Sequence, residues 1–157
     1  MLPSDAANLV KQLADLRDAS TTLFLESMRS EQLQLQLESQ EEKNGLLTRI
    51  VRLYFESPDL PVLYCKSCLS KHNLTREEYE SLAEGVLPIG VIFLRYNDSF
   101  LIKKTNITVT SEISPYFAAL LNVRSPLVYK KGYHYWVGRR DIGYVSEYFN
   151  DESLRRV

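Results

Sequence analysis

The chain has 157 residues, of which 45% are hydrophobic and 25% are charged. These are the proportions of an ordinary soluble globular protein, and the length allows one domain with a sizeable core. Nineteen basic and 20 acidic residues give a formal net charge of −1, which provides no electrostatic reason to expect a nucleic acid or an anionic membrane as partner. No apolar run approaches the roughly 20 residues of a membrane span. The acid-containing N-terminal stretch has no apolar segment followed by a cleavage site, so a cytoplasmic protein is expected.

The sequence before Pro58 predicts helices. Apolar residues recur at helical spacing over residues 4–18 and again over 46–56, and Pro58 ends the second of these segments. Residues 21–43, which lie between them, are polar and rich in glutamine and glutamate. Part of this stretch, LQLQLES, alternates with a period of two, which leaves helix and strand both open at that point.

A strand and a capped helix are expected next. The short run PVLYC predicts a strand. The following helix is predicted to start after Thr75, because Glu78 stands three residues later and completes a capping box. Gly85 is expected to end this helix, since glycine accepts the left-handed conformation common at helix C-termini.

The stretch VIFLRY-ND-SFLIKKTNITV predicts a β-hairpin, because Asn97 and Asp98 both tolerate the positive φ of a two-residue turn. In this register Gly90 pairs with Thr105. The segment SEISPYFAALLN predicts a short helix with Pro115 in its first turn. Two further strands are expected in SPLVYKKGYHYWVG and DIGYVSEYF.

Together these elements predict an α+β fold, in which a helical N-terminal third precedes an antiparallel β-sheet with short connecting helices. We expect a single domain over residues 1–157, with a helical extension at 1–42 and the core at 43–150. The N-terminal helices offer a surface for self-association. The polar helix predicted over 21–43 could also serve as a docking surface for another protein.

Glu147 stands out within the last strand. If residues 142–150 are extended, Glu147 shares one face with Gly143, Val145 and Phe149, and no other polar side chain lies there. A carboxylate is costly to bury unless it is satisfied. An edge strand with a solvated face and a buried acid placed for chemistry therefore both remain open. Since the chain has only two histidines, acid–base chemistry falls most naturally to a carboxylate, and Glu147 is the best placed.

Cys65 and Cys68 form a C-x-x-C motif, and His72 follows. As a zinc site this group supplies at most three ligands, whereas a structural zinc site needs four. As a redox motif it is expected at the start of a helix in a βαβ unit, and that context is missing. Two ordinary reduced thiols, a redox pair and a metal site remain open. We favour the thiols and expect no metal and no cofactor.

The order of these elements resembles the chorismate pyruvate-lyase family. The resemblance rests on the order of elements over roughly residues 46–150. A helix opening on LLTR, a strand and a β-hairpin come first, and a helix, SPL, GRR and a final strand with a glutamate before an aromatic residue follow. The family's relatives include the ligand-binding domains of certain bacterial transcription regulators. Its enzymes convert chorismate to 4-hydroxybenzoate and pyruvate without a metal or organic cofactor, in a pocket enclosed by a six-stranded antiparallel sheet and flap-like helices.

The resemblance implies roles for particular residues. Glu147 would be the catalytic acid, acting at the ether oxygen or the ring proton during elimination. Leu47 and Leu127 would offer backbone amides to a substrate carboxylate. The family's pair of arginines falls on Gly90 and Thr105, neither of which can replace a bidentate guanidinium.

A lysine could supply one charge in place of that arginine pair. Lys103 points to the same face as Thr105 in this register, whereas a turn shorter by one residue would place Lys104 at the arginine position. The expected ligand is a small aromatic or cyclohexadienyl carboxylate.

We expect chorismate-lyase activity, and the alternative is a non-catalytic binding module for such a ligand on the same fold. Residues 1–42 are too short and too acidic for a winged helix, so no nucleic acid is expected as a partner. Any regulatory role would then require a partner chain.

Overall fold

A computed structural model describes residues 3–16 and 20–157. The helices are α1 (Pro3–Asp15), α2 (Thr21–Arg29), α3 (Arg76–Glu84), α4 (Ile89–Tyr96), α5 (Pro115–Leu121) and α6 (Asp151–Leu154), with 3-10 turns at Lys71–Asn73 and Ser99–Leu101. The strands are β1 (Gln34–Lys43), β2 (Leu46–Tyr54), β3 (Leu63–Ser70), β4 (Ile102–Ile113), β5 (Leu127–Val137) and β6 (Arg140–Phe149).

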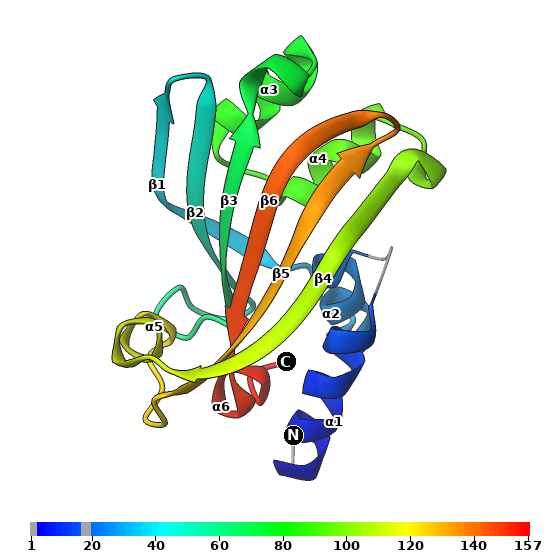
Figure 1. The fold of residues 1–157 in the computed structure, drawn as a ribbon. Coiled ribbons are helices and arrows are strands. Elements are labelled where there is room, and N and C mark those ends of the chain that lie inside the picture. Colours follow the sequence, from blue (N-terminus) through cyan, green and yellow to red (C-terminus); the bar gives the residue numbers. More distant parts are fainter. Residues whose placement is uncertain (1–2, 17–19) are drawn as a thin grey trace.

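All six strands form one antiparallel sheet in the order β1-β2-β3-β6-β5-β4. The sheet is strongly curved, and Figure 1 shows α2 and α4 on its far side and α5 beside its lower end. The predicted α+β class is confirmed. No helix among the described residues is long and apolar enough to cross a membrane.

The N-terminal helical part is shorter than predicted. Helix α1 agrees with the prediction over 4–18, of which residues 17–18 lie outside the described residues. Helix α2 ends at Arg29, where Ser30 adopts a left-handed conformation with φ of 57°. The single polar helix predicted over 21–43 is therefore wrong.

The helix predicted over 46–56 is also wrong, because this segment is strand β2 and pairs with β1. The two strands are joined by Asn44 and Gly45, whose φ values of 53° and 77° are those of a two-residue hairpin turn. Burial alternates strictly along β2. The side chains facing the helices are buried, so tertiary contacts select the strand period over the helical one.

The hairpin predicted around Asn97 is wrong. Its first half is helix α4, whose Ile92 and Phe93 are fully buried. Its second half, β4, pairs with β5, so that Thr105 lies opposite His134 and not opposite Gly90. Asn97 has a φ of −139° and uses its side chain as a donor to Glu78 and to the carbonyl of Phe93.

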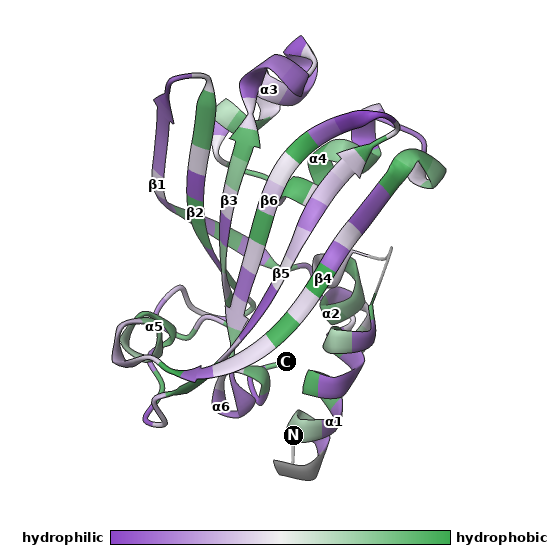
Figure 2. Ribbon diagram, in the orientation of Figure 1, coloured by the Kyte–Doolittle hydropathy of each residue, from purple (hydrophilic) through white to green (hydrophobic). Residues whose placement is uncertain are grey.

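Local signals in the second half are confirmed. Thr75 and Glu78 form the capping box of α3, and Gly85 ends that helix with φ of 69°. Pro115 lies in the first turn of α5, and both late strands are present. Figure 2 shows that the edge strand β1 is mostly hydrophilic, whereas the strands between the two edges carry more hydrophobic residues.

Candidate functional site

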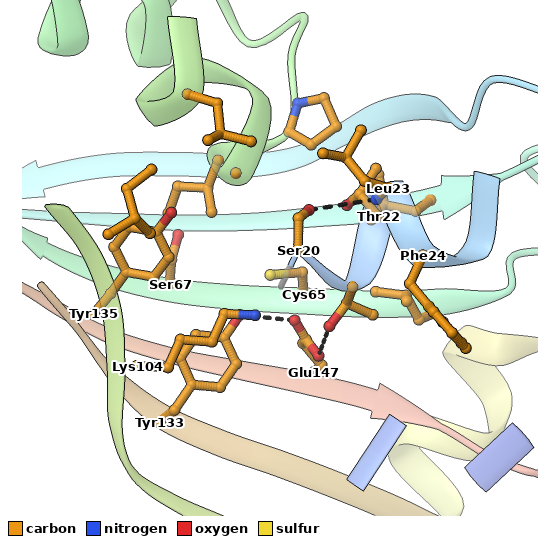
Figure 3. A pocket seen from close by; sticks show the side chains of 18 of the residues that line it. Ser20, Thr22, Leu23, Phe24, Cys65, Ser67, Lys104, Tyr133, Tyr135 and Glu147 are labelled. Carbon is orange, nitrogen blue, oxygen red and sulfur yellow. Dashed lines mark hydrogen bonds between the residues drawn. The ribbon is translucent and has the colours of Figure 1, made fainter. Parts of the chain in front are cut away.

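A cavity of about 400 Å³ lies between the inner face of the sheet and helices α2 and α4. Its volume is that of a small-molecule site. Most of its wall is apolar, with side chains from β2, β3, β4, α2 and α4: Val51, Leu63, Ile102, Phe24, Ile89 and Leu94. Figure 3 shows that the polar groups come from β3, β4, β5 and β6 and from the start of α2.

Glu147 lies inside this cavity. Strand β6 runs between β3 and β5, and the Glu147 side chain is 5% exposed, so the interpretation as a solvated edge strand is wrong. Its Oε1 accepts a hydrogen bond from Thr21 Oγ1 at 2.8 Å, and its Oε2 accepts one from the Tyr133 hydroxyl at 2.7 Å. Both carboxylate oxygens therefore serve as acceptors.

Tyr133 is held as a hydrogen-bond donor. Burial raises its pKa well above the ordinary value, and the neighbouring Glu147 carboxylate raises it further. The phenol therefore stays protonated at neutral pH and donates to the carboxylate. Its ring also supports a cation, because Lys104 Nζ lies 4.6 Å from the ring centroid.

Lys104 belongs to the cavity and Lys103 does not. The Lys104 side chain comes from the start of β4, is 8% exposed and points its ammonium group toward Glu147 (Figure 3). Lys103 is exposed on the opposite face of the strand, beside Trp136. Of the two lysines left open by the sequence, only Lys104 can reach a ligand in this cavity.

Arg49 is a charged residue of the cavity that the sequence did not single out. It lines the cavity from β2 and is only 2% exposed. Its Nη2 donates to the carbonyl of Leu87 at 2.8 Å, but its Nε has no hydrogen-bond partner among the described residues. Burial lowers the pKa of this guanidinium. A strand predicted over residues 46–54 would have singled out Arg49, because Leu47, Arg49 and Val51 lie on the same face of such a strand.

The other residues singled out from the sequence lie in different places. Gly90, on α4, lines the cavity, and a Cβ there would lie 2.9 Å from Ser20 Oγ, so glycine permits the close approach of α2 and α4. Leu47 is buried in the core, and Leu127 is 38% exposed at the start of β5. Thr105 is exposed and accepts a hydrogen bond from Trp136 Nε1 at 2.9 Å. The cavity therefore brings together Glu147, Lys104 and Gly90, but not Lys103, Thr105, Leu47 or Leu127.

The two cysteines lie in one strand, β3, and are both free. Residues three apart in a strand point to opposite faces, with Cα atoms about 10 Å apart, which is too far for a disulfide. Burial, assisted by the Glu147 charge, raises the pKa of Cys65 to about 12. No group of three or more potential metal ligands occurs within 3–16 and 20–157. This geometry favours the interpretation of Cys65 and Cys68 as ordinary thiols.

Solved structures share this arrangement of helices and sheet. PhnF from Mycobacterium smegmatis matches with a TM-score of 0.57 and 10% identity, over 84% of this chain and 64% of PhnF. A structure described as the ligand-binding domain of a GntR-family regulator from Bordetella bronchiseptica matches with a TM-score of 0.53 and 13% identity, over 75% of this chain and 84% of that domain. The chain has the fold of such a ligand-binding domain.

YydK from Bacillus subtilis matches with a TM-score of 0.50 and 11% identity, over 80% of this chain and 61% of YydK. At this level of identity the likeness establishes the fold alone. It agrees with the part of the sequence resemblance that concerned regulator ligand-binding domains. No protein-family model and no curated protein sequence matches this chain.

Proposed function

We propose that this protein is a binding module for a small, mostly apolar carboxylate, which includes the aromatic and cyclohexadienyl acids expected from the sequence. The observation that carries the proposal is the buried Arg49 guanidinium, whose Nε lacks a partner at the wall of an apolar cavity. A buried cationic donor without a partner is costly. A ligand carboxylate removes that cost by accepting from Nε.

The charges of the cavity support an anionic ligand. Two cations, Arg49 and Lys104, face one carboxylate, Glu147. Glu147 already accepts hydrogen bonds from Thr21 and Tyr133, and Lys104 points toward it (Figure 3). One positive charge is therefore left over at Arg49, and a monovalent carboxylate balances it.

Binding is tested by calorimetry and thermal unfolding with 4-hydroxybenzoate as the probe and its uncharged amide as the comparison. A ligand at 100 times its dissociation constant stabilises the native state by about 2.7 kcal/mol, which corresponds to a rise in Tm of about 5–10 °C for a chain of this size. The acid is expected to bind and the amide to bind much more weakly. Equal binding of both would contradict the role given to Arg49.

Variants identify the anion-binding groups. Arg49→Met removes a charged hydrogen bond worth about 1.5–3 kcal/mol, so affinity should fall roughly 10- to 150-fold. Arg95→Met is the matched control, because Arg95 is exposed on α4 and does not line the cavity. Lys103→Met serves in the same way as the control for Lys104→Met. A control that weakens binding as much as its partner variant would overturn the assignment.

A second candidate is the chorismate-lyase reaction, and the position of Glu147 beside Lys104 in the cavity favours it. Glu147 would exchange a proton with the substrate, while Arg49 and Lys104 hold its carboxylates. Pyruvate release from chorismate, followed with a coupled dehydrogenase, tests this activity, with Glu147→Gln as control. Release no faster than the spontaneous background, from folded protein, would exclude the lyase and leave the binding module.

A further inference from the structure

The outer edge of β4 is free. Among residues 3–16 and 20–157, this strand is the last in the sheet and pairs only with β5. The six residues 108–113 are all exposed. The backbone N–H and C=O groups on this edge can therefore accept another strand.

The composition of this edge favours strand pairing. Residues 108–113 read TVTSEI, in which four of six side chains are β-branched, one is charged, and neither lysine nor proline occurs. Natural proteins protect free edges with lysine, proline or a covering element. The opposite edge strand β1 shows such protection, since it carries four charged residues and receives a hydrogen bond from Tyr79 of α3 at Glu42. Residues 108–113 of β4 carry no lysine or proline.

Exposed apolar side chains gather along the same edge. Val109 and Ile113 are 36% and 68% exposed, and Leu127, which pairs with Ile113 across β5, is 38% exposed. Val109 and Ile113 are four residues apart in one strand, so they point to the same face of the sheet. This face provides apolar surface that strand addition would cover.

We propose that a second copy of this chain pairs with β4 antiparallel about a two-fold axis at Ser111, so that the sheet continues from one copy into the other. This register places Val109 opposite Ile113 of the second copy, twice by symmetry. It also places Thr110 opposite Glu112 of the second copy, which allows a hydroxyl–carboxylate contact. Both apolar residues then lie on the same face of the joined sheet.

Neighbouring registers are less favourable. An axis at Glu112 would set two carboxylates directly opposite each other, which is repulsive. An axis at Thr110 would place Ile113 against Ile107 of the second copy, where β4 is irregular because the register shifts between Thr105 and Thr108. A two-fold axis at Ser111 avoids both the repulsion between carboxylates and the irregular part of β4.

The oligomeric state of the full chain tests this interface. Light scattering after size exclusion is expected to give a dimer for the wild type and a monomer for Ser111→Lys, because two ammonium groups would meet on the axis. The dissociation constant should rise at least about tenfold. Ser39→Lys is the matched control, since Ser39 is an exposed serine on the other edge strand, β1, and it should remain dimeric.

Two results would overturn the proposal: a wild type that is monomeric at millimolar chain concentration, and a dimer that survives Ser111→Lys. Such a surviving dimer would direct attention to the N-terminal helices.

Oxidation of Ser111→Cys checks the register, since residues on the axis come within disulfide range, whereas Thr108→Cys should not cross-link. Without a Ser111→Cys cross-link the register is refuted.

Discussion

Replacing Arg49 with methionine should stabilise the empty protein while it weakens ligand binding. Taking a guanidinium out of water costs several kcal/mol. Arg49 recovers one charged hydrogen bond, to the carbonyl of Leu87 at 2.8 Å, which is worth about 1.5–3 kcal/mol. Its Nε recovers nothing. Methionine keeps an unbranched apolar side chain and has no charge to desolvate.

The balance favours methionine by about 1–2 kcal/mol in the free energy of unfolding. For a chain of this length the Tm should rise by about 2–8 °C. The carbonyl of Leu87 belongs to a partly exposed residue, so water can replace the lost donor. Thermal unfolding without ligand measures the effect, and Arg95→Met, on the surface of α4, provides the reference.

A fall in Tm for Arg49→Met, relative to Arg95→Met, would refute this reasoning. It would mean that the bond to Leu87 holds the segment before α4 in place more strongly than burial penalises the charge. Arg49 would then be a structural residue, and the proposed anion site would lose its main support. A rise in Tm together with weakened binding is expected instead, since sites built for function are often destabilising when empty.

Three further predictions concern buried polar groups. Burial alone would raise the pKa of Glu78, but hydrogen bonds from Arg140, the Thr75 backbone and Asn97 outweigh it and lower that pKa. The ionised carboxylate therefore stabilises the folded state above its unfolded pKa of about 4.3. This stabilisation is lost as the pH falls through the lowered pKa of the folded state. Urea titrations should give Glu78→Gln a free energy of unfolding lower than that of the wild type by roughly 3 kcal/mol at neutral pH, and by less in acid. A difference that does not change with pH would contradict the assignment. Cys65 should resist iodoacetamide at neutral pH until the protein unfolds, because its pKa is raised to about 12. Mass spectrometry of the labelled peptide measures this, and modification of Cys65 in the folded protein would contradict the prediction. Lys131 donates from β5 to carbonyls at the C-terminal end of α1. Lys131→Met should therefore speed the proteolytic removal of α1. An unchanged rate of cleavage would show that other contacts hold that helix.

Several local features were readable from the sequence because neighbouring residues alone decide them. The capping box of Thr75 and Glu78 needs only four consecutive residues, and Gly85 supplies the positive φ that ends the helix. The alternation in the last strand placed Glu147 among apolar side chains, and it is buried there. The Asn44-Gly45 pair is an equally local hairpin signal. The flanking segments also fit a helix, so this signal does not decide between helix and hairpin on its own.

By itself the sequence determined the α+β class, the capped helix α3, the two C-terminal strands and the apolar neighbours of Glu147 on one face of its strand, since local periodicity and capping suffice for these. The burial of that face was decided by the position of β6 between β3 and β5 in the sheet. Only the tertiary structure decided that the apolar run before Asn97 is helix α4 and that β4 pairs with β5. A continuous apolar run fits either period, and long-range packing selects one. The same packing turns Arg49 and Lys104 into the cavity beside Glu147, because their strands become neighbours only when the sheet has formed.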